Sequence, residues 1–287
     1  GNPQTRTSFH SFGYDIVNSP AVTDNYIVVA TGQMDTGGHI NHIYALPKDS
    51  ISETPIYDFS NHNIPICYFS SPVVAGDKIF ITSWGGDNGI YALESNRYTN
   101  NKILAVDLQN DNKTWQKELS APSFSTPAVS LLHNIVIAGC NSQKNESVFA
   151  FSLNGSKLWS KKIGAIGYAS PVIYESTVYV TSTITSSLST TTMLYALNLT
   201  DGKILWNKTI CSSNIMFSNN GDSTPAIFDH ILYVASPDGT LFALHASNGS
   251  ELWTTLVYNR SYLFSPSSLT SSPVYADGKV YLGLPSN

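Results

Sequence analysis

The stretch Ser223–Val257, which reads STPAIFDHILYVASPDGTLFALHASNGSELWTTLV, forms one repeat unit and predicts four short strands. Its Ser-Thr-Pro opening suits the start of a strand, because a proline there removes no ladder donor. The run Ile231–Ala235 is apolar throughout and too short for a helix, which indicates a strand buried on both faces. Turn signals at 237–239 (Pro-Asp-Gly) and 248–249 (Asn-Gly) lead into two further strands.

The same Ser-Pro or Ser-Xaa-Pro opening recurs along the whole chain. The separations between its prolines are 52, 55, 44, 54 and 48 residues, a period typical of propeller blades rather than of helical solenoids. The chain therefore begins six units, and we expect an all-β fold, a β-propeller of four-stranded antiparallel blades. The six prolines are Pro20, Pro72, Pro127, Pro171, Pro225 and Pro273.

A tryptophan recurs at one position of the predicted fourth strand. In the first unit, residues 56–59 (Ile-Tyr-Asp-Phe) stand there without a tryptophan. Burying each ring against a neighbouring unit would remove a large apolar area from water. We therefore interpret these residues as structural and expect truncation of one to cost roughly 3–5 kcal/mol. The four tryptophans are Trp115, Trp159, Trp206 and Trp253.

The segments that carry these tryptophans resemble the docking motif of PQQ-like, or quinoprotein-type, β-propeller repeats. They read LNLTDGKILW (197–206), ASNGSELW (246–253) and LNGSKLW (153–159), and the resemblance covers nearly the whole chain. It implies the propeller fold more directly than a function. The superfamily includes quinone-dependent alcohol dehydrogenases, non-enzymatic outer-membrane assembly scaffolds and surface proteins. The Trp-Asp dipeptide of WD40 repeats is absent from the sequence.

We expect residues 1–287 to form a single propeller domain, alone or as part of a longer chain. The sixth unit, 272–287, contains two predicted strands before the sequence ends. The segment Arg6–Asp15 precedes the first Ser-Pro by about the distance that separates a docking tryptophan from the next opening, and Phe9 stands near the tryptophan position. We predict that this segment adds as the outer strand of the last blade and closes the ring, which removes exposed sheet edges.

Composition narrows the class of function. Charged residues make up 12% of the chain and the net charge is -5, which argues against a nucleic-acid-binding surface. No apolar run approaches the roughly 18 residues of a membrane span. Low charge and polar loops suit an extracellular or cell-surface protein. Sequons compatible with a glycoprotein begin at Asn112, Asn145, Asn154, Asn198, Asn207, Asn248 and Asn259.

Aromatic side chains supply the candidate binding site. Phe69, Phe124 and Tyr168 each stand three residues before a repeat proline, in linkers that gather around the channel mouth of a propeller. Rings there can stack on a sugar, a quinone or a peptide. The alternative is that they wedge between blades as packing. Trp84 lies outside the docking register, so it can contact a ligand or anchor its own loop.

Two long insertions add further surface for binding. They lie at 86–101 and 182–192, each before a predicted third strand. Long loops on a rigid ring are common places for a binding site. The second insertion is rich in Ser and Thr, so a mobile, glycan-bearing loop is the alternative.

Two groups of potential metal ligands have a structural alternative that we favour. His39 and His42 are three residues apart where the chain enters a strand, which places them on opposite faces. Asp107, Asp111 and Asn112 can offer oxygen ligands to calcium, but they occupy a predicted hairpin turn and fit a solvated turn better. The three cysteines show no metal-ligand spacing, and a disulfide would leave one unpaired. They are Cys67, Cys140 and Cys211.

Two classes of function fit these features. The first, which we prefer, is a non-catalytic extracellular or cell-surface propeller that holds a protein or glycan partner and needs no cofactor. The second is a PQQ-dependent alcohol or sugar dehydrogenase. The resemblance implies that such enzymes are larger, eight-bladed rings with calcium and often an adjacent cysteine pair, whereas this chain begins six units without neighbouring cysteines. A third reading is an envelope assembly scaffold that pairs a partner strand along an outer blade edge.

Overall fold

The computed structural model describes residues 18–31, 42–48, 57–58, 70–83, 101–110, 113–187, 189–213, 223–258 and 271–284. These residues form five four-stranded antiparallel sheets and one two-stranded antiparallel sheet, which we call blades one to six in chain order. The strands are β1 (Ala21–Val22), β2 (Tyr26–Ala30), β3 (Ile43–Pro47), β4 (Tyr57–Asp58), β5 (Val73–Ala75), β6 (Lys78–Thr82), β7 (Lys102–Asp107), β8 (Trp115–Glu118), β9 (Ala128–Ser130), β10 (Ile135–Gly139), β11 (Val148–Ser152), β12 (Lys157–Lys161), β13 (Val172–Tyr174), β14 (Thr177–Thr185), β15 (Thr190–Asn198), β16 (Ile204–Ser213), β17 (Ala226–Phe228), β18 (Ile231–Ala235), β19 (Thr240–His245), β20 (Glu251–Leu256), β21 (Val274–Ala276) and β22 (Lys279–Tyr281).

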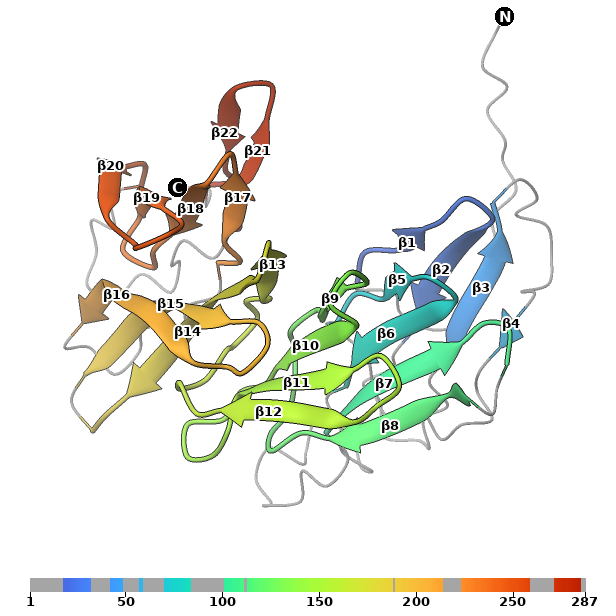
Figure 1. Cartoon of the computed structure of the whole chain (residues 1–287). Coiled ribbons are helices and arrows are strands. Elements are labelled where there is room, and N and C mark those ends of the chain that lie inside the picture. Colours follow the sequence, from blue (N-terminus) through green and yellow to red (C-terminus); the bar gives the residue numbers. More distant parts are fainter. Residues whose placement is uncertain are drawn as a thin grey trace, which may run out of the picture.

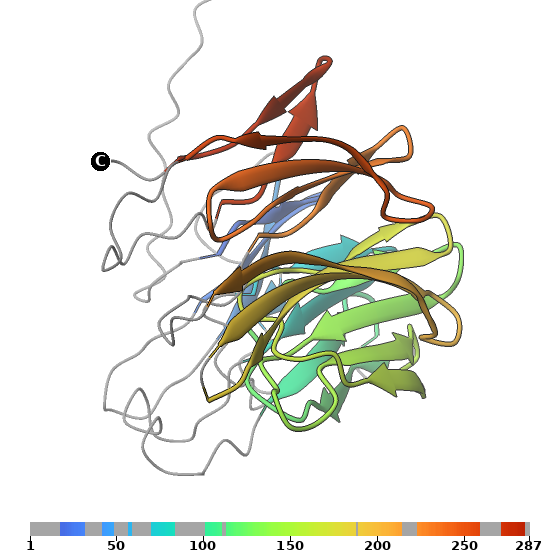
Figure 2. The same ribbon diagram turned by 90° about the vertical axis from the view of Figure 1, so that its left-hand side faces the viewer.

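Each four-stranded blade is a meander in which consecutive strands pair. The blades follow one another around a common centre, with the short first strands β1, β5, β9, β13 and β17 inside and the fourth strands outside (Figure 1). Figure 2 shows the successive sheets layered one above another. The all-β fold with four-stranded antiparallel blades is the one that the repeat predicts. The predicted closing segment, Arg6–Asp15, lies outside the described residues.

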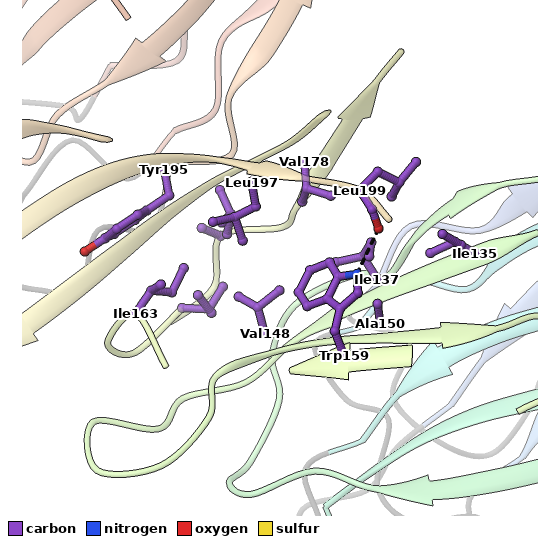
Figure 3. Close-up of a cluster of buried hydrophobic side chains, with 13 residues drawn as sticks. Ile135, Ile137, Val148, Ala150, Trp159, Ile163, Val178, Tyr195, Leu197 and Leu199 are labelled. Carbon is purple, nitrogen blue, oxygen red and sulfur yellow. Dashed lines mark hydrogen bonds between the residues drawn. The ribbon is translucent and has the colours of Figure 1, made fainter. Parts of the chain in front are cut away.

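The hydrophobic cores lie between neighbouring blades. All five residues of β10 and all five of β11 are buried, as expected of continuous apolar runs in sheets that are covered on both faces. One cluster joins Ile137 and Val148 of blade three to Val178 and Leu197 of blade four (Figure 3). Each blade therefore owes its burial to the next one along the chain.

A series of hydrogen bonds explains why a serine or threonine stands directly before each repeat proline. The amide of this residue donates to the hydroxyl of its equivalent in the next blade, so that a donor at the inner edge of the sheet is not left unpaired. Among the described residues, no such bond joins Ser272 back to Ser19. The five bonds are Ser19 N to Ser71 Oγ (3.1 Å), Ser71 N to Thr126 Oγ1 (3.1 Å), Thr126 N to Ser170 Oγ (3.0 Å), Ser170 N to Thr224 Oγ1 (2.9 Å) and Thr224 N to Ser272 Oγ (3.0 Å).

Three of the repeated tryptophans dock onto the following blade. Trp159 Nε1 donates to the carbonyl of Leu199 at 2.9 Å (Figure 3). The ring lies over Gly202, where an added Cβ would stand 2.6 Å from Trp159 Cε3. Only glycine allows this approach, and the φ of +70° at this turn also favours glycine. The equivalent contacts are Trp115 with the Leu153 carbonyl (3.0 Å) and Gly155, and Trp206 with the Ala246 carbonyl (2.9 Å) and Gly249.

The first and fifth blades depart from this pattern. In blade one, Tyr57 pairs with Ala45 at the position where other blades have a tryptophan. In blade five, Trp253 keeps the register opposite Ala243, yet its side chain is 43% exposed. The described residues of blade six contain no third strand and no third-to-fourth turn that would cover it.

Asp107 is buried at the start of an exposed turn, which corrects the expectation that its carboxylate is solvated. Its side chain is 6% exposed and its Oδ2 lies 2.8 Å from Lys78 Nζ. Its Oδ1 accepts the amides of Gln109 (3.0 Å) and Asn110 (2.8 Å). The carboxylate therefore builds the turn after β7. Asp111 and Asn112, the other two residues of this group, lie outside the described residues.

Gly202 and Gly278 provide a matched test of tryptophan docking. Both have φ near +70°, but no atom lies within 4 Å of a Cβ added at Gly278. Gly278→Ala should therefore cost only the backbone strain, about 1–2 kcal/mol. Gly202→Ala should cost about 1–3 kcal/mol more, because the methyl group would displace the Trp159 ring. Urea denaturation of both variants measures the difference, and equal losses would contradict the docking role of Gly202.

The carboxyl of Asp107 should make folding stability depend on pH. Burial raises its pKa, but the hydrogen bonds from Lys78, Gln109 and Asn110 outweigh that effect, so the folded pKa lies below the ordinary value. The contribution to stability is thus present above the unfolded pKa of about 3.9 and disappears as pH falls through the folded pKa.

We expect Asp107→Asn to lower the urea midpoint at pH 7, and the gap from wild type to narrow steadily below pH 4. Asp201→Asn is the control, because Asp201 pairs with Lys203 on the surface and is 43% exposed. A gap that stays constant from pH 7 to pH 3 would exclude the titration of Asp107 as its cause.

Candidate functional site

Two kinds of loop lie at the same end of every blade. The turn from second to third strand lies there, and so does the linker that enters the next first strand, because antiparallel strands reverse direction. We call this end the loop face. Its described parts include 119–126, 140–147, 162–170 and the turn between β14 and β15.

The loop face brings together two of the predicted site residues. Phe124 enters β9 and Tyr168 enters β13, and their rings stack with centroids 4.8 Å apart and planes 20° apart. The Tyr168 side chain is 46% exposed. The pair therefore packs between neighbouring linkers and also presents one aromatic ring to solvent. Phe69 and Trp84, the other two predicted residues, lie outside the described residues.

Buried hydroxyl groups hold the linker beneath this stack. Ser123 Oγ donates to the carbonyl of Gly139 at 2.6 Å, and Thr82 Oγ1 donates to the carbonyl of Ser125 at 2.5 Å. Ser123, Thr82 and Ser125 are at most 1% exposed. Because these bonds anchor the backbone on both sides of Phe124, the aromatic stack rests on a fixed support. The sequence signal for this hydroxyl support is the cluster of Ser and Thr residues just before the repeat proline.

The Ser/Thr-rich insertion is a β-hairpin and not an open loop. β14 and β15 are nine residues each and pair along their whole length, so they extend past the five-residue second strand of blade three. Thr183 forms a bridge with Ala165, and Ser182 Oγ donates to the carbonyl of Ile163 at 2.6 Å. The hairpin is thereby joined to the linker that carries Tyr168.

The side chain of Gln143 ties this hairpin to blade three. Its Nε2 donates to the carbonyl of Thr183 at 2.9 Å, and its Oε1 accepts the amide of Thr185 at 3.3 Å. A glutamine side chain thus acts as a short extra strand along the edge of β14. Sequence reasoning missed it, since nothing in the surrounding residues indicates which element it meets.

The fit of calcium or a quinone cofactor can be tested on the described part of the chain. No three residues of the types His, Cys, Asp and Glu come together there to hold a metal ion. His42 stacks on Tyr44 with ring centroids 5.0 Å apart, while His39 lies outside the described residues. No residue of the described loop face is therefore assigned to a calcium or quinone site.

Two of the three cysteines lie within the described residues. Cys140 is buried and Cys211 is partly buried. Burial raises the pKa of the Cys140 thiol to about 11, so the thiol stays protonated at neutral pH and is a poor nucleophile. Cys67 lies outside the described residues.

Comparison with protein families matches residues 144–287, about half of the chain, to the family described as outer membrane protein assembly factor BamB. No curated protein matches the sequence significantly. Among the described residues, no helix has the length and apolar character needed to cross a membrane.

Several solved structures resemble the chain. BamB from Moraxella catarrhalis is 18% identical, with a TM-score of 0.58 over 84% of this chain and 64% of that chain. A quinohemoprotein alcohol dehydrogenase from Pseudomonas putida HK5 is 11% identical, with a TM-score of 0.67 over 93% and 55%. A europium-containing methanol dehydrogenase is 13% identical, with a TM-score of 0.60 over 85% and 52%. The chain spans less than two thirds of each, and such identities show the propeller fold alone.

Gln143 gives a test of how the hairpin is held. Gln143→Ala should speed hydrogen exchange of the Thr185 amide several-fold, because its acceptor is lost, while the Val178 amide deeper in β14 keeps its protection. Gln143→Glu retains an acceptor for Thr185 and should restore most of the protection. Unchanged exchange at Thr185 in Gln143→Ala would show that the side chain does not hold the hairpin.

Proposed function

The chain belongs to the family of the outer membrane protein assembly factor BamB, and from this premise we propose that it is a non-catalytic scaffold whose loop face binds a polypeptide partner. The proposal includes a position outside the cytoplasm, in the envelope or at the cell surface. It rests on one observation above all, the exposed ring of Tyr168 stacked on Phe124.

The support beneath this ring favours binding over catalysis. The hydroxyls of Ser123 and Thr82 are already bonded to carbonyls, so they position the backbone instead of awaiting a substrate. A rigid aromatic ring on such a support loses little conformational entropy when a partner covers it. Tyrosine is also enriched among the residues that dominate protein–protein interfaces.

The shape of the surroundings favours a polypeptide over a small ligand. The hairpin of β14 and β15 extends beside the linker of Tyr168 and is joined to it through Thr183 and Ala165. The edge of β14 is already paired with Ala165 and Gln143. Exposed side chains near the hairpin tip, such as Ile184, extend the surface beyond the ring, as a polypeptide partner needs. A sugar would instead need several side-chain donors and acceptors around the ring.

In the test, immobilised protein is exposed to an envelope extract of its own source, and the eluate is quantified by mass spectrometry. We expect Tyr168→Ala to reduce the capture of envelope proteins at least tenfold, which corresponds to about 1.4 kcal/mol of binding free energy. Phe228→Ala is the matched control. Phe228 is equally exposed, at 50%, but it ends β17 at the face opposite the loop face. Equal loss in both variants, or in neither, would contradict the proposed site.

A second measurement separates the scaffold from the dehydrogenase alternative. Titration of the purified protein with PQQ and calcium, followed by tryptophan fluorescence, should give no saturable change if the function is non-catalytic. Tight calcium-dependent binding together with turnover of an alcohol or sugar would overturn the proposal. Retention of a glycan by wild type but not by Tyr168→Ala would replace the polypeptide with a carbohydrate partner.

A further inference from the structure

Five of the sequons lie among the described residues, and the structure explains four of them. Three asparagines stand at the turns between third and fourth strands, where their side chains shape the turn. In the fourth sequon, 145–147, the hydroxyl residue is fully buried, and Ser147 Oγ accepts the Ile163 amide at 3.3 Å. The turn bonds join Asn154 Oδ1 to Ser156 N (3.3 Å), Asn198 Oδ1 to Thr200 N (2.9 Å) and Asn248 Oδ1 to Ser250 N (2.9 Å).

The fifth sequon, 207–209 (Asn-Lys-Thr), lies in the middle of β16 and has no such explanation. Asparagine is depleted in strands, because its side chain competes for nearby backbone groups. Asn207 and Thr209 are both exposed. Neither a turn nor a hydrogen bond within the described part of the chain accounts for an asparagine at this position.

The strand geometry presents both groups of this sequon on one side of β16. Trp206 docks on blade five, and Lys208 Nζ lies 3.5 Å from Glu251 Oε2 in that blade. Residues 206–209 pair with β15 without interruption, so the alternate side chains of Asn207 and Thr209 point to the other face. The amide and the hydroxyl are therefore open to one enzyme at the same time.

β16 also has the longest outer edge of the four-stranded blades. It contains ten residues, against four in β8, five in β12 and six in β20, and it pairs with no strand beyond β15 among the described residues. Ile204 (40%) and Leu205 (53%) are exposed on it. Its one charged residue, Lys208, is paired with Glu251. An open apolar edge of this kind associates with other chains unless something blocks it.

We propose that Asn207 carries an N-linked glycan that covers the outer edge of β16. In the attachment, Asn207 Nδ2 displaces the phosphate group of a lipid-linked oligosaccharide from C1 of its first sugar. The N–C1 bond forms and the C1–O bond breaks. The lipid phosphate leaves with the electron pair of that bond, and the Nδ2 proton passes to a base of the transferase. This inference rests on the proposed function only for a position outside the cytoplasm.

Mass spectrometry of the protein purified from its own source tests the assignment directly. Trypsin cuts after Lys203 and Lys208, so Asn207 lies in peptide 204–208, while peptide 145–157 contains both Asn145 and Asn154. We expect saccharide masses on peptide 204–208, with loss of most of its unmodified signal, and an unmodified peptide 145–157. An unmodified peptide 204–208 overturns the proposal, and so does equal occupancy of the two peptides.

A matched pair of variants tests whether the sequon directs the attachment. Thr209→Val keeps a β-branched side chain in the strand but removes the hydroxyl, so the glycan should be lost. Thr209→Ser keeps the sequon and should keep the glycan. A saccharide on peptide 204–208 that persists in Thr209→Val shows attachment by another route, such as at the Lys208 amine, and overturns the proposal.

Light scattering tests the role of the glycan at the edge. Made in its own source, Thr209→Val should self-associate several-fold faster than wild type, because the edge of β16 is then uncovered. Made in a host without N-glycosylation, the two proteins should behave alike. Equal rates in the first case, or a difference that persists in the second, overturn this role. Capture by Tyr168→Ala is measured on protein from the second host, so the proposed function and this inference fail separately.

Discussion

An indole ring that rests on the hairpin glycine of the next blade is the contact on which the rest of the propeller depends. A meander of four short strands cannot bury both of its faces alone, so each blade is stable only against its neighbours. Trp159 shows how one side chain meets this need, with its ring over Gly202 and its Nε1 bonded to the Leu199 carbonyl. One turn of the next blade therefore both covers the apolar surface of the indole ring and accepts a hydrogen bond from its N–H group.

At the starts of the inner first strands, small hydroxyl groups join neighbouring blades in a similar way. The Ser71 hydroxyl accepts a hydrogen bond from the Ser19 amide, and the Ser71 amide donates to the Thr126 hydroxyl. The same pattern continues from blade to blade as far as Ser272. The chain is thus tied together by tryptophans outside and hydroxyls inside. Both sets of contacts therefore act between neighbouring blades.

Neither set of contacts uses the aromatic side chains of the loop face. Phe124 and Tyr168 occupy linkers whose backbones are held by Ser123 and Thr82, so an exposed aromatic ring is carried without loss of core packing. The joined hairpin of β14 and β15 adds further surface beside it. In the proposed function, binding is therefore a property of the loop face, while the repeat itself maintains the scaffold.

The sequence by itself determined the repeat, the strand meander and the register of the tryptophans, because these depend on local patterns that recur in each unit. It also indicated that Phe124 and Tyr168 share one end of the ring, since both stand at the same offset from a repeat proline. It could not indicate that Asp107 is buried against Lys78, that the Ser/Thr run from 182 continues as paired strands, or that Gln143 meets β14.

Those features, and the exposure of Trp253 beside the two described strands of blade six, were decided by the tertiary structure. The reason is physical. A side chain's local pattern says which way it points from its own strand, but whether it is covered or bonded depends on atoms from a neighbouring blade that lies some fifty residues away along the chain.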